Sequence, residues 1–316
     1  MQGWTPNAHG EAYLANNDLS KSMRHAARPM MVFRQFLTLE DGSFLKKGQS
    51  KLITRVSKVA ASGYDATSTD MARTPETTVT FTQQTCTVYL RRMSIPWTGL
   101  LENVSQFDPN NVDAVALRDD MAETLNKLAA VPFTSCKLKY TPTGSTVSPE
   151  GTLVTGGTVS ATATRHIQIW DMKQIKRTMG ETYLIPKYDG KNYITIMPDF
   201  SLGQLFDEEE VQEGLRYGKP EALFAGEMKQ YDGIRYMLDN SAMTSAMGGT
   251  SYYGEGVVFG HDAVVEVITK PEELRRKLSV DYGEDQGVGW FYTGGFAETQ
   301  PVATARHVKI VHITSV

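Results

Sequence analysis

The longest regular pattern of apolar positions in the chain lies between residues 108 and 131. Its apolar side chains recur three or four residues apart and form one stripe of a helix: Leu117, Met121, Leu125 and Leu128. Asp108 is placed to accept hydrogen bonds from the first turn, and Pro109 suits the first helical position. Pro132 is expected to end the helix. About 23 residues at roughly 1.5 Å each make a rod of about 35 Å, so we expect this helix to be the spine of the fold.

Strand-like alternation predicts a hairpin before this helix. Residues 51–59 and 77–83 are rich in β-formers, with Val79 and Phe81 alternating against threonines. The connecting residues 60–76 are small and polar and offer almost nothing to bury. About nine residues at roughly 3.3 Å each would carry the tip about 30 Å from its root. Because an isolated hairpin is marginally stable in water, we expect this one to need a partner surface.

Several segments lack a regular period. Residues 1–28 are polar, as in an arm or a disordered tail, whereas residues 30–39 are apolar enough to dock on other elements. The Thr- and Gly-rich residues 141–164 indicate short strands or a segment ordered by its contacts. Residues 241–256 are rich in Gly, Ser and Tyr, which is typical of a mobile loop.

The remaining pattern alternates between strands and helices in no regular order. Strands are predicted at 86–95, 193–197, 233–238, 257–259, 264–268 and 307–313. Helices are predicted at 169–179, closed by Gly180, and from about Asp207 onward. Because no βαβ alternation appears, the sequence predicts an α+β class.

Composition narrows the class of protein further. With 316 residues, the chain can bury a large core and is expected to divide into two or more domains. The formal net charge of -4 argues against a nucleic-acid-coating protein, which would usually be basic. No apolar run approaches the roughly 18 residues needed to span a bilayer, and the N-terminus shows no secretory signal. Cys86 and Cys136 lack a CxxC partner, which fits a reducing cytoplasm and leaves a disulfide between them open.

Titratable residues do not assemble into a recognisable catalytic or metal site. The acidic run Asp207–Glu210 is better explained as a solvated first turn of a helix, because adjacent acids on a helix point in different directions. His166, His261 and His307 belong to no HExxH or HxH pattern. The basic triplet 275–277 follows two glutamates and is expected on a solvated helix face.

Glycine and serine motifs give no stronger signal. Gly254-Glu255-Gly256 and the pair Gly294–Gly295 stand outside the GxGxxG and GxxxxGKS patterns that cradle phosphates. An SxxK motif, Ser43 to Lys46, lacks the SDN and KTG motifs that would complete a site. We therefore predict no enzyme activity, no catalytic residue, no metal site and no cofactor.

The end of the chain carries a specific likeness to a known family. Two segments, 254–268 and 279–313, resemble the closing segments of podovirus-type major capsid proteins of tailed bacteriophages, which have the Hong Kong 97-type fold. In those proteins a strand ends in Phe-Gly, as at Phe259, and a Gln-Gly-x-Gly-Trp element later leads into the last strand. That element is present here as Gln286, Gly287, Gly289 and Trp290.

The resemblance implies a division of the chain into named parts. They are an N-terminal arm at 1–37, an extended loop at 38–85, a peripheral domain at 86–135 and 271–316, a Thr/Gly-rich insertion at 136–165, and an axial domain at 166–270. It also implies a virion protein, assembled in the host cytoplasm, that forms hexamers and pentamers of a shell enclosing double-stranded DNA. No membrane is involved.

The partners implied are the chain itself, a portal and a separate scaffolding protein, because the arm leaves no room for a fused scaffold. Whether a decoration protein covers the shell stays open. The covalent cross-linking performed by the namesake of the fold needs a neutral, buried lysine, and no pattern around Lys51 or Lys58 indicates one. Two alternatives remain: a cellular, encapsulin-like protein cage, and a soluble α+β enzyme or binding module.

Overall fold

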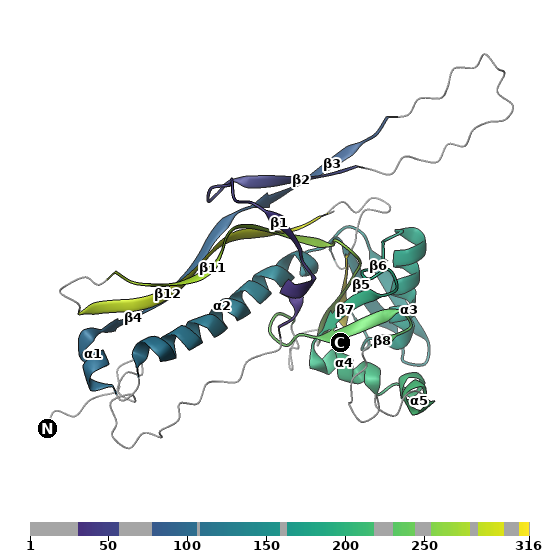
Figure 1. The fold of residues 1–316 in the computed structure, drawn as a ribbon. Helices are drawn as coiled ribbons and strands as arrows, with labels where there is room; N and C mark the ends of the chain where they lie inside the picture. Colours follow the sequence, from purple (N-terminus) through teal and green to yellow (C-terminus); the bar gives the residue numbers. More distant parts are fainter. Residues whose placement is uncertain are drawn as a thin grey trace, which may run out of the picture.

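Two β-sheets and one long helix form the body of the molecule (Figure 1). The computed structural model describes residues 31–56, 78–105, 108–158, 163–217, 230–243, 254–278, 284–299 and 310–315. The predictions for residues 1–28, for the hairpin tip at 60–76 and for His307 therefore lie outside the described residues.

The small sheet has four strands in the order β1-β11-β12-β4. Their bounds are β1 (Thr38–Asp41), β4 (Tyr89–Thr98), β11 (Val264–Arg276) and β12 (Asp285–Glu298). β1 runs parallel to β11, and the other neighbours are antiparallel. A separate antiparallel hairpin of β2 (Ser50–Val56) and β3 (Phe81–Thr87) projects from the body above this sheet (Figure 1).

The long helix α2 (Pro109–Thr134) packs against one face of the small sheet. The short helix α1 (Gly99–Val104) connects β4 to it. The Asp108 carboxylate accepts from the N–H of Asn110 at 3.0 Å, so the predicted cap is confirmed. Leu117 and Leu125 are fully buried in one cluster, together with Trp97, Val288, Trp290 and Tyr292. The predicted apolar stripe is therefore core at these two positions, whereas Met121 and Leu128 are half-buried.

Pro132 does not end the helix as predicted. It lies inside the last turn, which continues to Thr134 and closes with the N–H of Ser135 donating to the Val131 carbonyl at 2.9 Å. This turn is buried, and the ring of Phe133 lies 4.8 Å from that of Phe259. The burial of Phe133 in this last turn stabilises the helix there by more than the one intrahelical hydrogen bond that Pro132 removes.

The large sheet has seven strands in the order β6-β5-β13-β10-β7-β9-β8. Their bounds are β5 (Leu138–Gly144), β6 (Pro149–Val154), β7 (Tyr193–Met197), β8 (Gln230–Tyr231), β9 (Ile234–Leu238), β10 (Gly254–Phe259) and β13 (Ile310–Ser315). Every residue of β7 is buried, because hydrophobic clusters cover both faces of the sheet. One of these clusters contains Phe133 and so joins the end of α2 to the large sheet.

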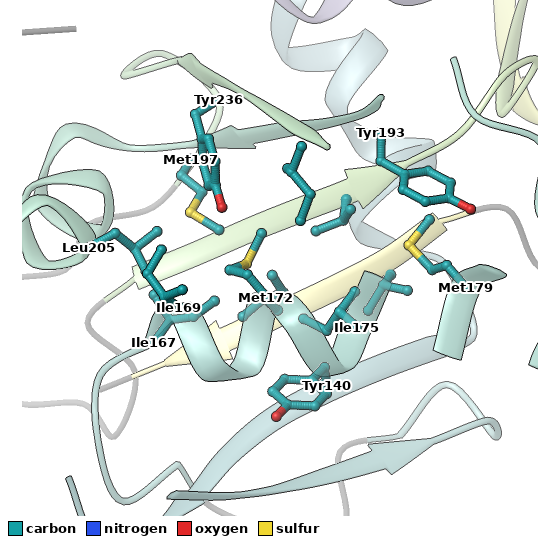
Figure 2. Packing of buried hydrophobic residues seen from close by; sticks show 14 of the residues in the cluster. Tyr140, Ile167, Ile169, Met172, Ile175, Met179, Tyr193, Met197, Leu205 and Tyr236 are labelled. Atoms are coloured by element: carbon teal, nitrogen blue, oxygen red, sulfur yellow. The ribbon is translucent and has the colours of Figure 1, made fainter. Parts of the chain in front are cut away.

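Three helices cover the other face of the large sheet. They are α3 (Ile169–Arg177), α4 (Asp199–Phe206) and α5 (Glu209–Tyr217). Met172 and Ile175 of α3 point toward the sheet and lie among Tyr140, Met197 and other buried side chains (Figure 2). Gly180 does not close α3 as predicted, since the helical path continues through a π-helical turn at Thr178–Thr182. The helix expected from about Asp207 begins at Glu209.

The Thr/Gly-rich stretch after α2 is part of the large sheet. β5 and β6 form an antiparallel hairpin, and β5 also pairs in parallel with β13. Arg165 anchors this hairpin: its guanidinium donates to both carboxylate oxygens of Asp171, at 2.6 and 2.7 Å, and to the carbonyls of Thr143 and Glu150. Both members of this ion pair are buried. Of the two predicted alternatives, short strands are correct.

Several strand bounds differ from those predicted. The strand expected at 86–95 is interrupted at Val88, and the one expected at 264–268 extends to Arg276. The basic residues 275–277 therefore lie at the end of β11 and just beyond it, not on a helix. The last four residues of β11 are all exposed, so this end of the strand has no alternation of apolar and polar residues from which it could be predicted.

Sheet membership and the implied domain ranges do not coincide everywhere. β11 begins at Val264, within the range 166–270 expected for the axial domain, but belongs to the small sheet. β13 lies within the range 271–316 expected for the peripheral domain, but belongs to the large sheet. The chain thus passes between the two sheets more often than the linear map implies.

Candidate functional site

Two residues of the acidic run Asp207–Glu210 form contacts that stabilise the fold. The Glu208 carboxylate accepts from the N–H of Ile169 at 3.0 Å, at the first turn of α3, and burial raises the pKa of Glu208 to about 7. Lys173 forms an ion pair with Glu210, and this hydrogen bond lowers the pKa of Glu210. Both acids therefore link the start of α5 to α3.

The histidines and the remaining motif residues are also dispersed. His166 precedes α3, whereas His261 is exposed beside the ring of Tyr188. The Ser43 hydroxyl donates to Asp41 at 3.0 Å within its own turn. Within the described residues, no group of three or more His, Cys, Asp or Glu side chains is arranged to hold a metal ion.

Both cysteines are free and buried. Burial raises the pKa of Cys86 to about 11 and that of Cys136 to about 12, so both thiols stay protonated at neutral pH. The disulfide that the sequence left open is absent from this structure. No helix in the described part of the chain is long and apolar enough to cross a membrane.

The projecting hairpin has two unlike faces. Alternate residues of β2 and β3 point toward the body, where Ile53 and Cys86 pack with Val88 and with Val265, Val267 and Ala297 of the small sheet. Lys51 forms an ion pair with Glu40 at 2.9 Å, and Arg55 forms one with Asp262. These contacts fix the root of the hairpin to the body.

The opposite face of the hairpin is bare. It consists of Leu52, Thr54, Val56, Phe81, Gln83 and Thr85, all exposed, and is called the free face below. Leu52, Val56 and Phe81 are 57%, 62% and 64% exposed. Val56 pairs directly with Phe81, so their side chains form one apolar area on a ribbon two strands wide. Such a patch indicates a surface that another molecule covers.

The segment before β1 is held at the junction of three elements. The N–H of Val32 donates to Asp239 after β9, and the N–H of Phe33 donates to Asn126 of α2, both at 2.9 Å. Arg34 forms ion pairs with Glu266 of β11 at 3.0 Å and with Glu272 at 2.8 Å. The hydrogen bond from Arg34 lowers the pKa of Glu272. The predicted docking of residues 30–39 is confirmed for the described part.

The sequence missed the free face for an identifiable reason. It showed Phe81 in an alternating pattern, but alternation alone does not say which face is buried. The inner face is set by Ile53 and Cys86, whose partners come from strands about two hundred residues further along the chain. The charged residues of β2, Lys51 and Arg55, lie half-buried on the inner face in ion pairs, so the charge pattern did not mark the exposed face either.

The fold has known counterparts. Solved structures similar to this chain include the capsid of Ralstonia phage GP4, with 14% identity, a TM-score of 0.66 and coverage of 95% of each chain. The capsid of cyanophage Pam1 matches with 11% identity and a TM-score of 0.70, over 100% of this chain and 99% of that chain. The head of Helicobacter pylori bacteriophage KHP40 matches with 11% identity and a TM-score of 0.66, over 95% of each chain.

Sequence comparison gives no such match. No protein-family model matches the chain. No curated protein matches it either. The likeness to phage capsid proteins that the sequence indicated is thus confirmed at the level of the fold.

Proposed function

We propose that this chain is the major capsid protein of a tailed bacteriophage, with a Hong Kong 97-type fold, and that copies of it form the icosahedral head shell around double-stranded DNA. The observation that carries the proposal is the likeness in fold over 94–100% of this chain to phage capsid structures. A likeness over whole chains leaves no additional domain to carry a different activity within these 316 residues.

The free face of the hairpin supports a role in assembly. The root of the hairpin is stabilised by its own subunit, but the exposed side chains of Leu52, Val56 and Phe81 become buried only if a neighbour covers them. Identical subunits that each lay this face on the next form head-to-tail contacts, which close into rings. Rings of six and of five subunits are the arrangement that the resemblance implies.

The sheets support a division of the subunit into four parts. Residues 1–37 would form the N-terminal arm and residues 38–85 the extended loop. The small sheet with α2 would form the peripheral domain. The large sheet with α3, α4 and α5 would form the axial domain, which then includes β5, β6 and β13. The former insertion at 136–165 thereby becomes part of the axial domain.

The negative net charge of the chain is compatible with a shell that encloses DNA. A net charge of -4 provides no general electrostatic attraction for DNA, so the shell can enclose DNA without adhering to it throughout. A separate scaffolding protein and a portal would be partners during assembly in the host cytoplasm, and the virion would be the final location.

Electron microscopy of the purified protein tests the proposal. Negative staining should show closed particles of uniform size, and the same particles isolated from a phage infection should contain double-stranded DNA. Particles that contain protein cargo and no DNA would indicate the cellular cage instead. A protein that stays monomeric both alone and with its scaffolding protein would refute the shell function.

A matched pair of variants tests the free face. Val56→Asp with Phe81→Asp should leave a folded subunit, because both side chains are exposed, but should abolish particles. Val147→Asp is the control, since Val147 is 93% exposed at the tip of the β5–β6 hairpin. Normal assembly of the double variant would remove the free face from the proposal.

A further inference from the structure

Residues 32–34 connect the two sheets through polar contacts, and this segment is called the strap below. It leads into the 3₁₀-helix η2 (Phe33–Phe36), which lies beside α2 (Figure 1). Shortly after η2 the chain pairs with β11 of the small sheet as β1, from Thr38 onward. The strap therefore crosses the junction between the sheets, and each of its three residues binds a different part of the molecule.

On the side of the large sheet, the strap binds buried polar groups. The N–H of Val32 donates to a carboxylate oxygen of Asp239, directly after β9, at 2.9 Å. The N–H of Phe33 donates to the side-chain oxygen of Asn126 in α2 at 2.9 Å, and the Asn126 amide donates to the same oxygen of Asp239 at 2.8 Å. Asp239 and Asn126 are buried. Removing the strap from this position would therefore leave buried acceptors with fewer hydrogen bonds, which costs free energy.

On the side of the small sheet, Arg34 binds two carboxylates of β11. Its guanidinium donates to Glu266 through Nε at 3.2 Å and through Nη2 at 3.0 Å, and to Glu272 through Nη1 at 2.8 Å. Glu266 is 0% exposed. Among the described residues, the other side-chain partner of its carboxylate is the Tyr292 hydroxyl, which donates at 2.8 Å. A buried carboxylate that loses its cation is strongly destabilising, so the strap is held firmly to the small sheet.

The strap is too short to leave slack between these attachments. Val32 and Arg34 are two residues apart, and two residues span at most about 7 Å even when fully extended. The large sheet at Asp239 and the small sheet at Glu266 can therefore change their relative position little while both contacts persist. The small sheet also holds the root of the hairpin, through Ile53 and its neighbours. A rotation of this sheet would consequently change the direction of the free face.

We propose that the strap locks the two sheets at one angle, and that Arg34, as a positioning residue, thereby sets the curvature of the shell. The inference rests on the proposed function. The angle between the sheets determines the direction in which the free face meets the next subunit, and a repeated contact of one direction closes at one radius. A loosened strap permits several angles, so the same subunits would close into particles of several sizes.

A double variant separates the lock from the stability of the fold. Arg34→Met alone should lower the melting temperature of the unassembled subunit by about 5 °C, because Glu266 stays buried without its cation. Adding Glu266→Gln removes that charge and keeps an acceptor for the Tyr292 hydroxyl, so most of the loss should be recovered. Lys176→Met is the matched control. It removes an ion pair with Asp232, at 2.7 Å and of similar exposure, that lies wholly on the side of the large sheet.

Spin labels on the unassembled subunit measure how well the angle is defined. Leu100→Cys, on α1 next to β4, and Val147→Cys, in the turn between β5 and β6, are both exposed and can carry the labels. The native Cys86 and Cys136 are buried. The distances between the labels should be narrowly distributed in the parent and in Lys176→Met, and more broadly in the double variant. An unchanged distribution in the double variant would overturn the lock.

Negative-stain images of particles test the consequence for the shell. The parent and the Lys176→Met control should each give particles of one diameter, and the double variant should give particles of several. One diameter, or no particles at all, from the double variant would overturn the effect on curvature and leave the capsid function standing. If the parent itself forms no particles, the proposed function fails, whereas the spin-label distances still decide whether the strap locks the sheets.

Discussion

Replacing Leu125 by alanine should lower the free energy of unfolding of the subunit by about 4 kcal/mol. Leu125 is 0% exposed and lies in a cluster with Leu117, Trp97 and Trp290. The change removes about three buried methyl or methylene groups, worth about 0.8 kcal/mol each, or about 2.4 kcal/mol together. A residual cavity of about 70 Å³ adds about 1.7 kcal/mol at about 24 cal/mol per Å³.

Urea unfolding of the unassembled subunit measures this loss. The fluorescence of Trp97 and Trp290 reports on the cluster that contains Leu125, so the probe and the perturbation share one core. Leu100→Ala is the matched control, because Leu100 is 61% exposed on α1 and should lose about 0.5 kcal/mol or less. A loss below about 1 kcal/mol for Leu125→Ala would mean that α2 does not pack on the small sheet as described.

Three further predictions concern the ion pairs and one buried acid. Arg165→Met should cost about 3–5 kcal/mol in urea unfolding, because it leaves the buried Asp171 carboxylate unpaired, and Asp171→Leu in the same chain should recover much of it. Burial raises the pKa of Glu298 from 4.5 to about 7, so the folded state binds the extra proton and stability falls as pH rises between these values. Glu298→Gln should therefore gain stability relative to the parent between about pH 5 and 7, by at most about 3 kcal/mol, in thermal melts across this range; an unchanged difference would refute the assignment. Boiled, mature particles should give monomer bands on denaturing gels, because Lys51 lies in a partly exposed ion pair with Glu40 and not in the buried surroundings that cross-linking needs; ladders would contradict this.

The elements that the sequence predicted well are those whose signals are local. Helix α2 follows from the spacing of Leu117 and Leu125 and from the cap at Asp108, all within one segment. The end of this helix does not follow, since Pro132 is accommodated by the packing of Phe133 against Phe259. That contact joins residues more than a hundred positions apart, and no local pattern records it.

The order of strands in the sheets could not be predicted from the sequence for a similar reason. β5 lies beside β13 because Leu138 pairs with Val311, and a parallel pairing across this separation leaves no spacing to detect. The last strand was predicted at 307–313, whereas residues 141–164, which overlap β5, were left open between short strands and a segment ordered by its contacts. Alternation does not identify partners in either case. The patterns of apolar and polar residues predicted only individual helices and strands. The likeness to phage capsid proteins was needed to predict how they are arranged. Gly287 and Gly289 were recognised as part of a motif, but their close packing against the backbone of β4 became apparent only from the structure.

Helix α2 belongs to two hydrophobic cores at once. Leu117 and Leu125 lie in the core of the small sheet, and Phe133 lies in a core that also covers the large sheet. A continuous helix of 26 residues, about 39 Å long, therefore couples the two mechanically. Neither sheet can rotate relative to the other without bending this rod or pulling a leucine or a phenylalanine out of its core. Strain applied at one end of the subunit is thereby transmitted to the other as a change in curvature.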